Sequence, residues 1–254
     1  MKRFSLFAAI LALCVVAVSV RAEDKPKVAM PVAGADGWIS LFNGKDTSEW
    51  LGLEGCWIVE EGALTCKLLE PNKRQSDAIL IASKDHPEKF ANFELRYSFK
   101  WVTKTGNSGV QFRGEIDNPA MLHVGGYQAD TDPSNGYTGI IYCEGKVAGG
   151  RGIMSKRGEK TVWDKDNKRT DAKLAMPEAD IKKAIKPVGE WNDCVVVADG
   201  THIVYSINGV VTTDLTDESP KGKADGLIAL QMHAGPPMTI QFKDIKIKML
   251  EAKK

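Results

Sequence analysis

Short apolar segments separated by turn residues run through most of the chain. In Phe93–Trp101 apolar and polar side chains alternate with a period of two. That period places successive side chains on opposite faces of a β-strand, with one face buried and the other solvated. From Trp38 onward such segments follow one another at short intervals, which is typical of a β-sandwich or barrel. The pattern predicts an all-β fold.

The second half of the chain indicates consecutive hairpins. Tight-turn dipeptides, Asp199-Gly200 and Asn208-Gly209, separate three apolar segments. The predicted strands of this half are Val195–Ala198, Ile203–Ile207, Val210–Thr213, Gly226–His233 and Met238–Ile247. One short helix is expected at Pro177–Lys186, because Pro177 suits a helix start and Pro187 stops it.

Residues 132–173 differ from the rest, since they are rich in glycine and charge. A loop of this length in a compact domain is usually functional or disordered. Its glycines surround aromatic and charged residues, which favours a shaped binding loop; these are Tyr137, Tyr142, Glu144 and Arg151.

The N-terminus has the features of a secretory signal peptide at residues 1–22: a cationic start, a short apolar run and small residues before a charged stretch. A retained membrane anchor is the alternative. We expect export to the periplasm or the extracellular space, a flexible linker at residues 23–36, one domain at residues 37–250 and a tail at residues 251–254.

Four cysteines follow the signal segment. A three-residue turn with Gly62 in the left-handed position would set Cys56 opposite Cys66, close enough for a disulfide in an oxidising compartment. A two-residue turn would separate them, and two buried thiols are the alternative. No partner can be assigned to Cys143 or Cys194.

Charge gives no sign of a polyanionic partner, since 34 Lys and Arg nearly balance 33 Asp and Glu. We therefore expect no nucleic-acid partner, and no membrane partner once the signal peptide is removed. The oligomeric state cannot be predicted. Nucleotide binding and serine-nucleophile chemistry are disfavoured, because their glycine-rich motifs are absent.

Polar groups are densest in Asn107–Gly114 and Gly126–Asp130. If both are strands, Gln111 and Arg113 share a face, and so do Gln128 and Asp130. Such amide, guanidinium and carboxylate groups suit sugar recognition. The alternative is an ordinary solvated sheet face.

His233 ends an otherwise apolar strand and follows Gln231. Its imidazole is a candidate acid or base, although such a residue is more often structural.

Several segments, in order, resemble the 3-keto-disaccharide hydrolase domain family over about residues 37–250. They read GWISLFNGKDTSEW, NFELRYSFKW, NSGVQFRG, GYQAD, YTGIIYCEG, GEWNDCVVV, INGV and IALQMHAGPPMTIQFKDIKIK.

The resemblance implies a concanavalin A-like jelly-roll sandwich of two antiparallel sheets. It also implies cleavage of glycosides oxidised to a ketone at glucose carbon 3. The ketone acidifies the carbon 2 proton, so a base can drive elimination of the aglycone, with water added afterwards. Residues in the matching segments are then expected to line the sugar site: Arg113, Gln128, Asp130, Tyr142, Glu144, Gln231 and His233.

Within that set Asp130 or His233 is the expected base, while Arg113 and Gln128 would hold substrate oxygens. No organic cofactor is expected. A divalent metal that polarises the ketone is left open, because no ligand set can be read from the sequence. The expected partner is an oxidised glycoside or another carbohydrate. Two other functions stay open: a lectin-like module without catalysis, and an ordinary glucanase, which the absence of a Glu-x-Asp-x-x-Glu motif disfavours.

Overall fold

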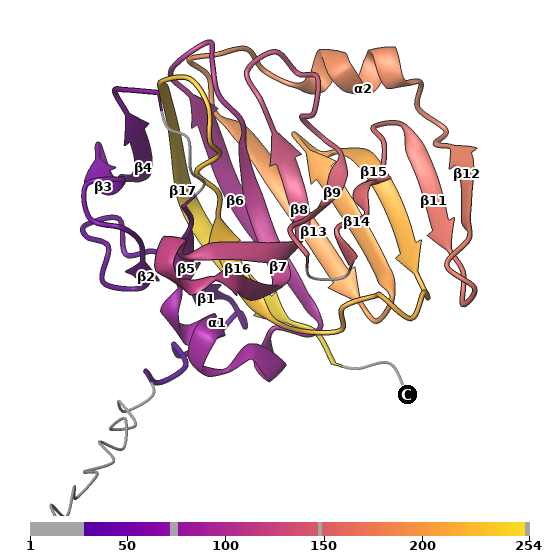
Figure 1. The fold of residues 1–254 in the computed structure, drawn as a ribbon, viewed down its shortest axis with the longest axis horizontal. Helices are drawn as coiled ribbons and strands as arrows, with labels where there is room; N and C mark the ends of the chain where they lie inside the picture. Colours follow the sequence, from indigo (N-terminus) through magenta and orange to yellow (C-terminus); the bar gives the residue numbers. More distant parts are fainter. Residues whose placement is uncertain (1–27, 72–75, 147–148, 252–254) are drawn as a thin grey trace, which may run out of the picture.

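The alternating strands assemble into two sheets packed face to face in the computed structural model (Figure 1). The structure describes residues 28–71, 76–146 and 149–251. Of the predicted regions, the signal peptide lies outside these residues, as do residues 23–27 of the linker and 252–254 of the tail. The predicted all-β, two-sheet sandwich is confirmed.

The larger sheet has, in the described residues, the strand order β12-β11-β15-β14-β13-β6-β17-β4-β3, with β1 paired to β17. Its strands are β1 (Ile39–Ser40), β3 (Trp57–Glu60), β4 (Ala63–Leu68), β6 (Phe93–Trp101), β11 (Glu159–Trp163), β12 (Arg169–Lys173), β13 (Asn192–Asp199), β14 (His202–Ile207), β15 (Val210–Asp217) and β17 (Met238–Met249). The pairing of β11 with β15 is parallel, and the other pairings described for this sheet are antiparallel.

The smaller sheet has the order β10-β9-β8-β7-β16-β5-β2, and its described pairings are antiparallel. Its strands are β2 (Trp50–Leu51), β5 (Ala78–Leu80), β7 (Ser108–Asn118), β8 (His123–Thr131), β9 (Ile141–Glu144), β10 (Gly152–Ser155) and β16 (Leu227–Leu230). The short helices are α1 (Ile81–Asp85), α2 (Glu178–Ala184) and the 3-10 turns η1 (Pro87–Lys89) and η2 (Pro119–Met121). In Figure 1, α1 and α2 lie at opposite ends of the sandwich.

The main core lies between the sheets and is built from the apolar faces that the alternation predicts. Phe93, Leu95 and Tyr97 of β6 are buried there with Phe112 of β7 and Tyr127 of β8. Phe112 stacks on Tyr127 at 5.7 Å and meets Phe93 edge-on at 6.2 Å. Because Tyr127 points into the core, the residues next to it on β8 point to the other face of the smaller sheet.

Several element boundaries agree with the sequence. Strand β6 coincides with Phe93–Trp101, and α2 lies inside the predicted helix with Pro177 as its N-cap. Asn208 and Gly209 both have positive φ (50° and 80°), as a type I′ turn requires. The strand expected to reach His233 ends at Leu230 instead.

The predicted β3–β4 turn is wrong. Glu61 and Gly62 form a two-residue turn, each with positive φ (52° and 73°), and Glu60 pairs with Ala63. This register sets Cys66 opposite Trp57. Cys56 and Cys66 are free thiols in the structure, so the predicted disulfide is not formed.

The prediction of one long loop at residues 132–173 is also wrong. Four strands, β9 to β12, lie in this region. Glycines and charges hid them, because two of the strands are short and β12 is an exposed edge strand without an apolar face.

A buried ion pair joins the two sheets. The Arg151 guanidinium, just before β10, lies 2.5 Å from the Asp217 carboxylate at the end of β15, and both side chains are buried. Tyr127 and Ser219 donate further hydrogen bonds to this carboxylate. Burial opposes ionisation of Asp217, but hydrogen bonds from Arg151, Ser219 and Tyr127 outweigh it and lower its pKa.

Asp217→Asn is expected to lower the free energy of unfolding by about 3 kcal/mol at pH 7, because it leaves the Arg151 charge buried without a counter-charge. A group with a lowered folded-state pKa stabilises the fold above its ordinary pKa, here 3.8, and loses this effect as the pH falls through the folded-state value. Urea denaturation should therefore show the difference intact between pH 5 and 7 and smaller near pH 3. Asp180→Asn, in an exposed ion pair with Lys183, is the control and should change little. A pH-independent loss would contradict this assignment.

Candidate active site

The register of three adjacent strands gathers polar side chains on the outer face of the smaller sheet. Gln128 of β8 lies between Gln111 of β7 and Tyr142 of β9, each directly paired with it. Directly paired residues place their side chains on the same face, and so do residues two apart on one strand. Asp130 and Glu144 therefore share the face of Gln128.

A pocket of about 290 Å³ opens on this face. It is lined by Asn107, Gln128, Asp130, Tyr137, Tyr142, Glu144 and His233. Five of the seven predicted site residues are thus together: Gln128, Asp130, Tyr142, Glu144 and His233. The volume of the pocket is at the lower end of the range for small-molecule sites and suits a single sugar ring.

Gln231 lies behind this lining and holds it together. Its Nε2 donates to Glu144 Oε2 at 3.2 Å, and its Oε1 accepts from Gln128 Nε2, also at 3.2 Å. The amide orientation of Gln128 is thereby fixed. Its Oε1 is buried and has no hydrogen-bond partner among the described residues.

Arg113 does not reach the pocket. The β7–β8 register shifts between Phe112 and Glu115, and Arg113 itself has φ 48°, so alternation from Gln111 breaks down. Its buried guanidinium donates to the Ala91, Gly200 and Lys223 carbonyl oxygens. This set of backbone acceptors makes Arg113 a structural residue, which corrects the predictions that it shares a face with Gln111 and holds substrate oxygens.

Asp130 is the most deeply buried carboxyl group of the pocket, with 3% of its surface exposed. Asn107 Nδ2 donates to its Oδ1 at 3.1 Å. Burial raises the pKa of Asp130 well above its ordinary value, and the nearby charge of Asp132 adds to this effect, although the hydrogen bond from Asn107 opposes it. These surroundings favour the protonated form of Asp130 more than those of an exposed aspartate do.

Asp132, two residues further on, is held as a carboxylate. It is partly desolvated, but Ser134 and the backbone N–H groups of Tyr137, Gly136 and Thr138 donate to it and lower its pKa. These bonds close the turn between β8 and β9. The turn presents Tyr137, 48% exposed, at the pocket wall.

His233 has a defined tautomer. Its Nδ1 lies 2.5 Å from the Ala234 carbonyl oxygen, which can only accept, so Nδ1 carries the proton. In the neutral ring Nε2 then has a free lone pair. Tyr142 lies on the same wall, and burial, with a contribution from Glu144, raises the pKa of its hydroxyl.

Asn107 is the lining residue that the sequence did not single out. It begins the segment that leads into β7 and was outside the alternation used to choose Gln111 and Arg113. Tyr137 was noted in the glycine-rich stretch but was not included in the predicted site.

In the described part of the chain, no group of three or more His, Cys, Asp and Glu residues is arranged to hold a metal ion. None of the described helices is long and apolar enough to cross a membrane.

Residues 37–248 match the family described as the 3-keto-alpha-glucoside-1,2-lyase-like domain. The chain belongs to this family. A 3-keto-disaccharide hydrolase from Bacteroides thetaiotaomicron is 25% identical to this chain over 210 residues, which are 75% of this chain and 62% of the relative. The chain thus matches somewhat less than two thirds of that protein's length.

Solved structures agree with this fold. A candidate glycosyl hydrolase from Parabacteroides distasonis has a TM-score of 0.55 and 21% identity, with 89% of this chain and 100% of that one covered. A carbohydrate-binding module from Bacillus subtilis has a TM-score of 0.50 and 12% identity, with 79% and 95% covered. At these identities the likeness shows the fold that the family domain shares with them.

At pH 7, replacing the carboxyl groups of Asp130 and Asp132 should change the free energy of unfolding in opposite directions. Because burial raises the folded-state pKa of Asp130, its stability contribution is complete below its ordinary value of 3.8 and is lost as the pH rises through the folded-state value. Asp130→Asn has no proton to lose. It should be more stable than the unmodified protein at pH 7, by an amount of order 1 kcal/mol, and gain less at pH 4.

Asp132→Asn is the matched comparison, because the pKa of Asp132 is lowered. It should be less stable at pH 7, with a difference that shrinks only as the pH falls below about 3.8. Urea denaturation of the three proteins at several pH values measures both effects. If Asp130→Asn destabilises at pH 7 as much as Asp132→Asn, the buried carboxyl group is not protonated more readily than its neighbour.

Proposed function

We propose that this protein cleaves the glycosidic bond of 3-keto-glucosides by elimination across carbons 1 and 2, followed by addition of water. One observation carries the proposal: Asp130, a buried carboxyl group with a raised pKa, lines the same polar pocket as the imidazole of His233. The family and the name of the Bacteroides thetaiotaomicron relative support this substrate class.

The chemistry needs a proton acceptor and a proton donor. The acceptor removes the proton on carbon 2, which the adjacent ketone acidifies. The electron pair forms the carbon 1–carbon 2 double bond while the bond from carbon 1 to the aglycone oxygen breaks, and a donor protonates that oxygen. Water then adds oxygen to carbon 1 and a proton returns to carbon 2. The net products are 3-keto-glucose and the free aglycone.

The two central groups divide these roles by their surroundings. His233 Nε2, left with its lone pair by the Nδ1 hydrogen bond, is the proton acceptor at carbon 2. Asp130, retained in its neutral form by burial, is the donor. A carboxyl group whose raised pKa favours its protonated form can serve as the acid in such a pair.

The remaining polar groups are assigned to substrate binding. Gln128 lies on the same pocket wall as the Tyr142 hydroxyl and the Glu144 carboxylate, and these three side chains are assigned to the sugar hydroxyls. Gln231 is a positioning residue, since it orients Gln128 and Glu144 through its amide. Polar groups fixed before the substrate arrives require little reorganisation during the reaction.

A carbohydrate-binding module without catalysis is the second candidate. The fold likeness to the Bacillus subtilis carbohydrate-binding module favours it, because the same sandwich can serve binding alone.

We also propose that the protein is exported, because residues 1–22 have the features of a signal peptide. The proposed reaction uses no organic cofactor.

Purified protein should release aglycone from a chromogenic 3-keto-glucoside and not from the unoxidised glucoside. Asp130→Ala is expected to lower kcat/KM by about 100-fold or more, the usual contribution of a general acid or base. Asp130→Asn should lose about as much, because an amide can donate a hydrogen bond but cannot transfer a proton to the aglycone oxygen. His233→Ala should lose about 100-fold, since the proton acceptor is removed.

His202→Ala provides the matched histidine control, because His202 is exposed and pairs with Asp214 on another part of the fold. It should keep full activity. If Asp130→Asn keeps the activity of the unmodified protein, a proton-donor role for Asp130 is wrong. Binding of the 3-keto-glucoside without release by the unmodified protein would leave the binding module as the function.

A further inference from the structure

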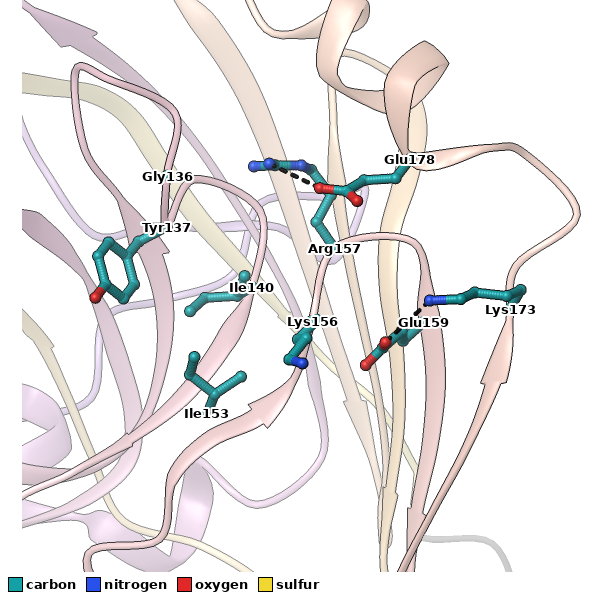
Figure 2. Close-up of a pocket in the computed structure, with 9 residues that line it drawn as sticks. All are labelled: Gly136, Tyr137, Ile140, Ile153, Lys156, Arg157, Glu159, Lys173 and Glu178. Atoms are coloured by element: carbon teal, nitrogen blue, oxygen red, sulfur yellow. Dashed lines mark hydrogen bonds and ion pairs between the residues drawn. The ribbon is translucent and has the colours of Figure 1, made fainter.

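A second and larger pocket, of about 560 Å³, lies beside the candidate site. Figure 2 shows its lining, which comes from the β8–β9 turn, β10, β11, β12 and the start of α2. The lining residues are Gly136, Tyr137, Ile140, Ile153, Lys156, Arg157, Glu159, Lys173 and Glu178. The proposed chemistry leaves this space unused.

The two pockets are adjacent on the smaller sheet. Tyr137 lines both of them. Tyr142 of the first pocket is directly paired with Ile153 of the second, so their side chains are neighbours on one face. A single row across β8, β9 and β10 therefore runs from Gln128 through Tyr142 to Ile153, and the lining changes from amide to aromatic to aliphatic.

Most charges around the second pocket are already neutralised. Arg157 pairs with Glu178 at 3.1 Å and also donates to the carbonyl oxygens of Asn135 and Thr138, which ties the β8–β9 turn in place. Lys173 pairs with Glu159 at 3.1 Å. These pairs are the dashed contacts in Figure 2. The walls that these two pairs form therefore carry little net charge.

Lys156 is different. It is exposed, and among the described residues its ammonium group makes no hydrogen bond or close ion pair, although its charge helps to lower the pKa of Asp171. In Figure 2 it lies between Ile153 and Glu159. The second pocket thus offers an apolar part, lined by Ile140, Ile153 and Tyr137, next to the exposed ammonium group of Lys156.

We propose that the second pocket binds the aglycone, and that it favours an aromatic leaving group carrying an acidic substituent. This inference rests on the proposed function, because it places the 3-keto-glucosyl ring in the first pocket. The aglycone, which is bonded to carbon 1 of this sugar ring, then extends past Tyr137 and Tyr142 and contacts Ile153. The acidic substituent ends near the ammonium group of Lys156.

Three 3-keto-glucosides of the same anomeric form test this: methyl, 4-nitrophenyl and 4-carboxyphenyl. The comparison is the ratio of variant to unmodified protein for each substrate, so differences in leaving-group reactivity cancel. Lys156→Gln should raise KM for the 4-carboxyphenyl substrate about two- to fivefold, the range expected for an exposed ion pair, and leave the other two unchanged. Ile153→Ala should raise KM for both aryl substrates and not for the methyl substrate.

Lys160→Gln is the matched control, since Lys160 is an exposed lysine of β11 outside the pocket lining and lies 3.8 Å from Asp214. It should change none of the three KM values. Equal KM changes for all substrates with Lys156→Gln, or no change for the 4-carboxyphenyl substrate, would overturn the aglycone site while activity on the methyl substrate keeps the proposed function.

A binding measurement separates this inference from failure of the proposed chemistry. If no substrate is cleaved, 4-hydroxybenzoate alone is titrated against the unmodified protein and Lys156→Gln, with chemical shifts as the readout. Binding that is weakened by Lys156→Gln and not by Lys160→Gln supports an acidic aromatic site. Equal or absent binding in all three proteins overturns it.

Discussion

The strand register between β8 and β9 is the constraint on which the rest of the site depends. Pairing of Gln128 with Tyr142 and of Gly126 with Glu144 fixes which side chains share the outer face. A slip of one residue would move this whole set to the core face and expose Tyr127 and Cys143 instead. Because Tyr127 stacks on Phe112 and bonds to Asp217, the core secures the register that the pocket needs.

Two carboxyl groups near the pocket have opposite surroundings. Asp130 and Asp132 are two residues apart, yet desolvation outweighs the hydrogen bonds of the first, while the second accepts several backbone hydrogen bonds that lower its pKa. Asp132 therefore shapes the turn, and Asp130 is the group for which we propose proton donation. The charge of Asp132 also raises the pKa of Asp130, so the residue that closes the turn influences the proposed donor.

The sequence allowed the fold and most of the pocket to be predicted, because both follow from period-two alternation and the resemblance of several ordered segments. Alternation failed at Arg113, where a bulge reverses the expected direction, and bulges leave little trace in a single sequence. It failed in β10 and β12, since short and edge strands need no apolar face. The Cys56–Cys66 expectation failed on turn length alone: one residue fewer in the turn sets Trp57 opposite Cys66.

The central step that we propose is removal of the carbon 2 proton within the pocket that Asp130 and His233 line. Conversion of a 3-keto-glucoside in D2O, with NMR of the 3-keto-glucose formed, tests that step most directly, with a sample of 3-keto-glucose alone as the measure of spontaneous exchange. Elimination and rehydration predict one deuterium at carbon 2 of every product molecule, well above the spontaneous level. Product that retains the original hydrogen at carbon 2 would mean direct displacement at carbon 1 and would contradict the account.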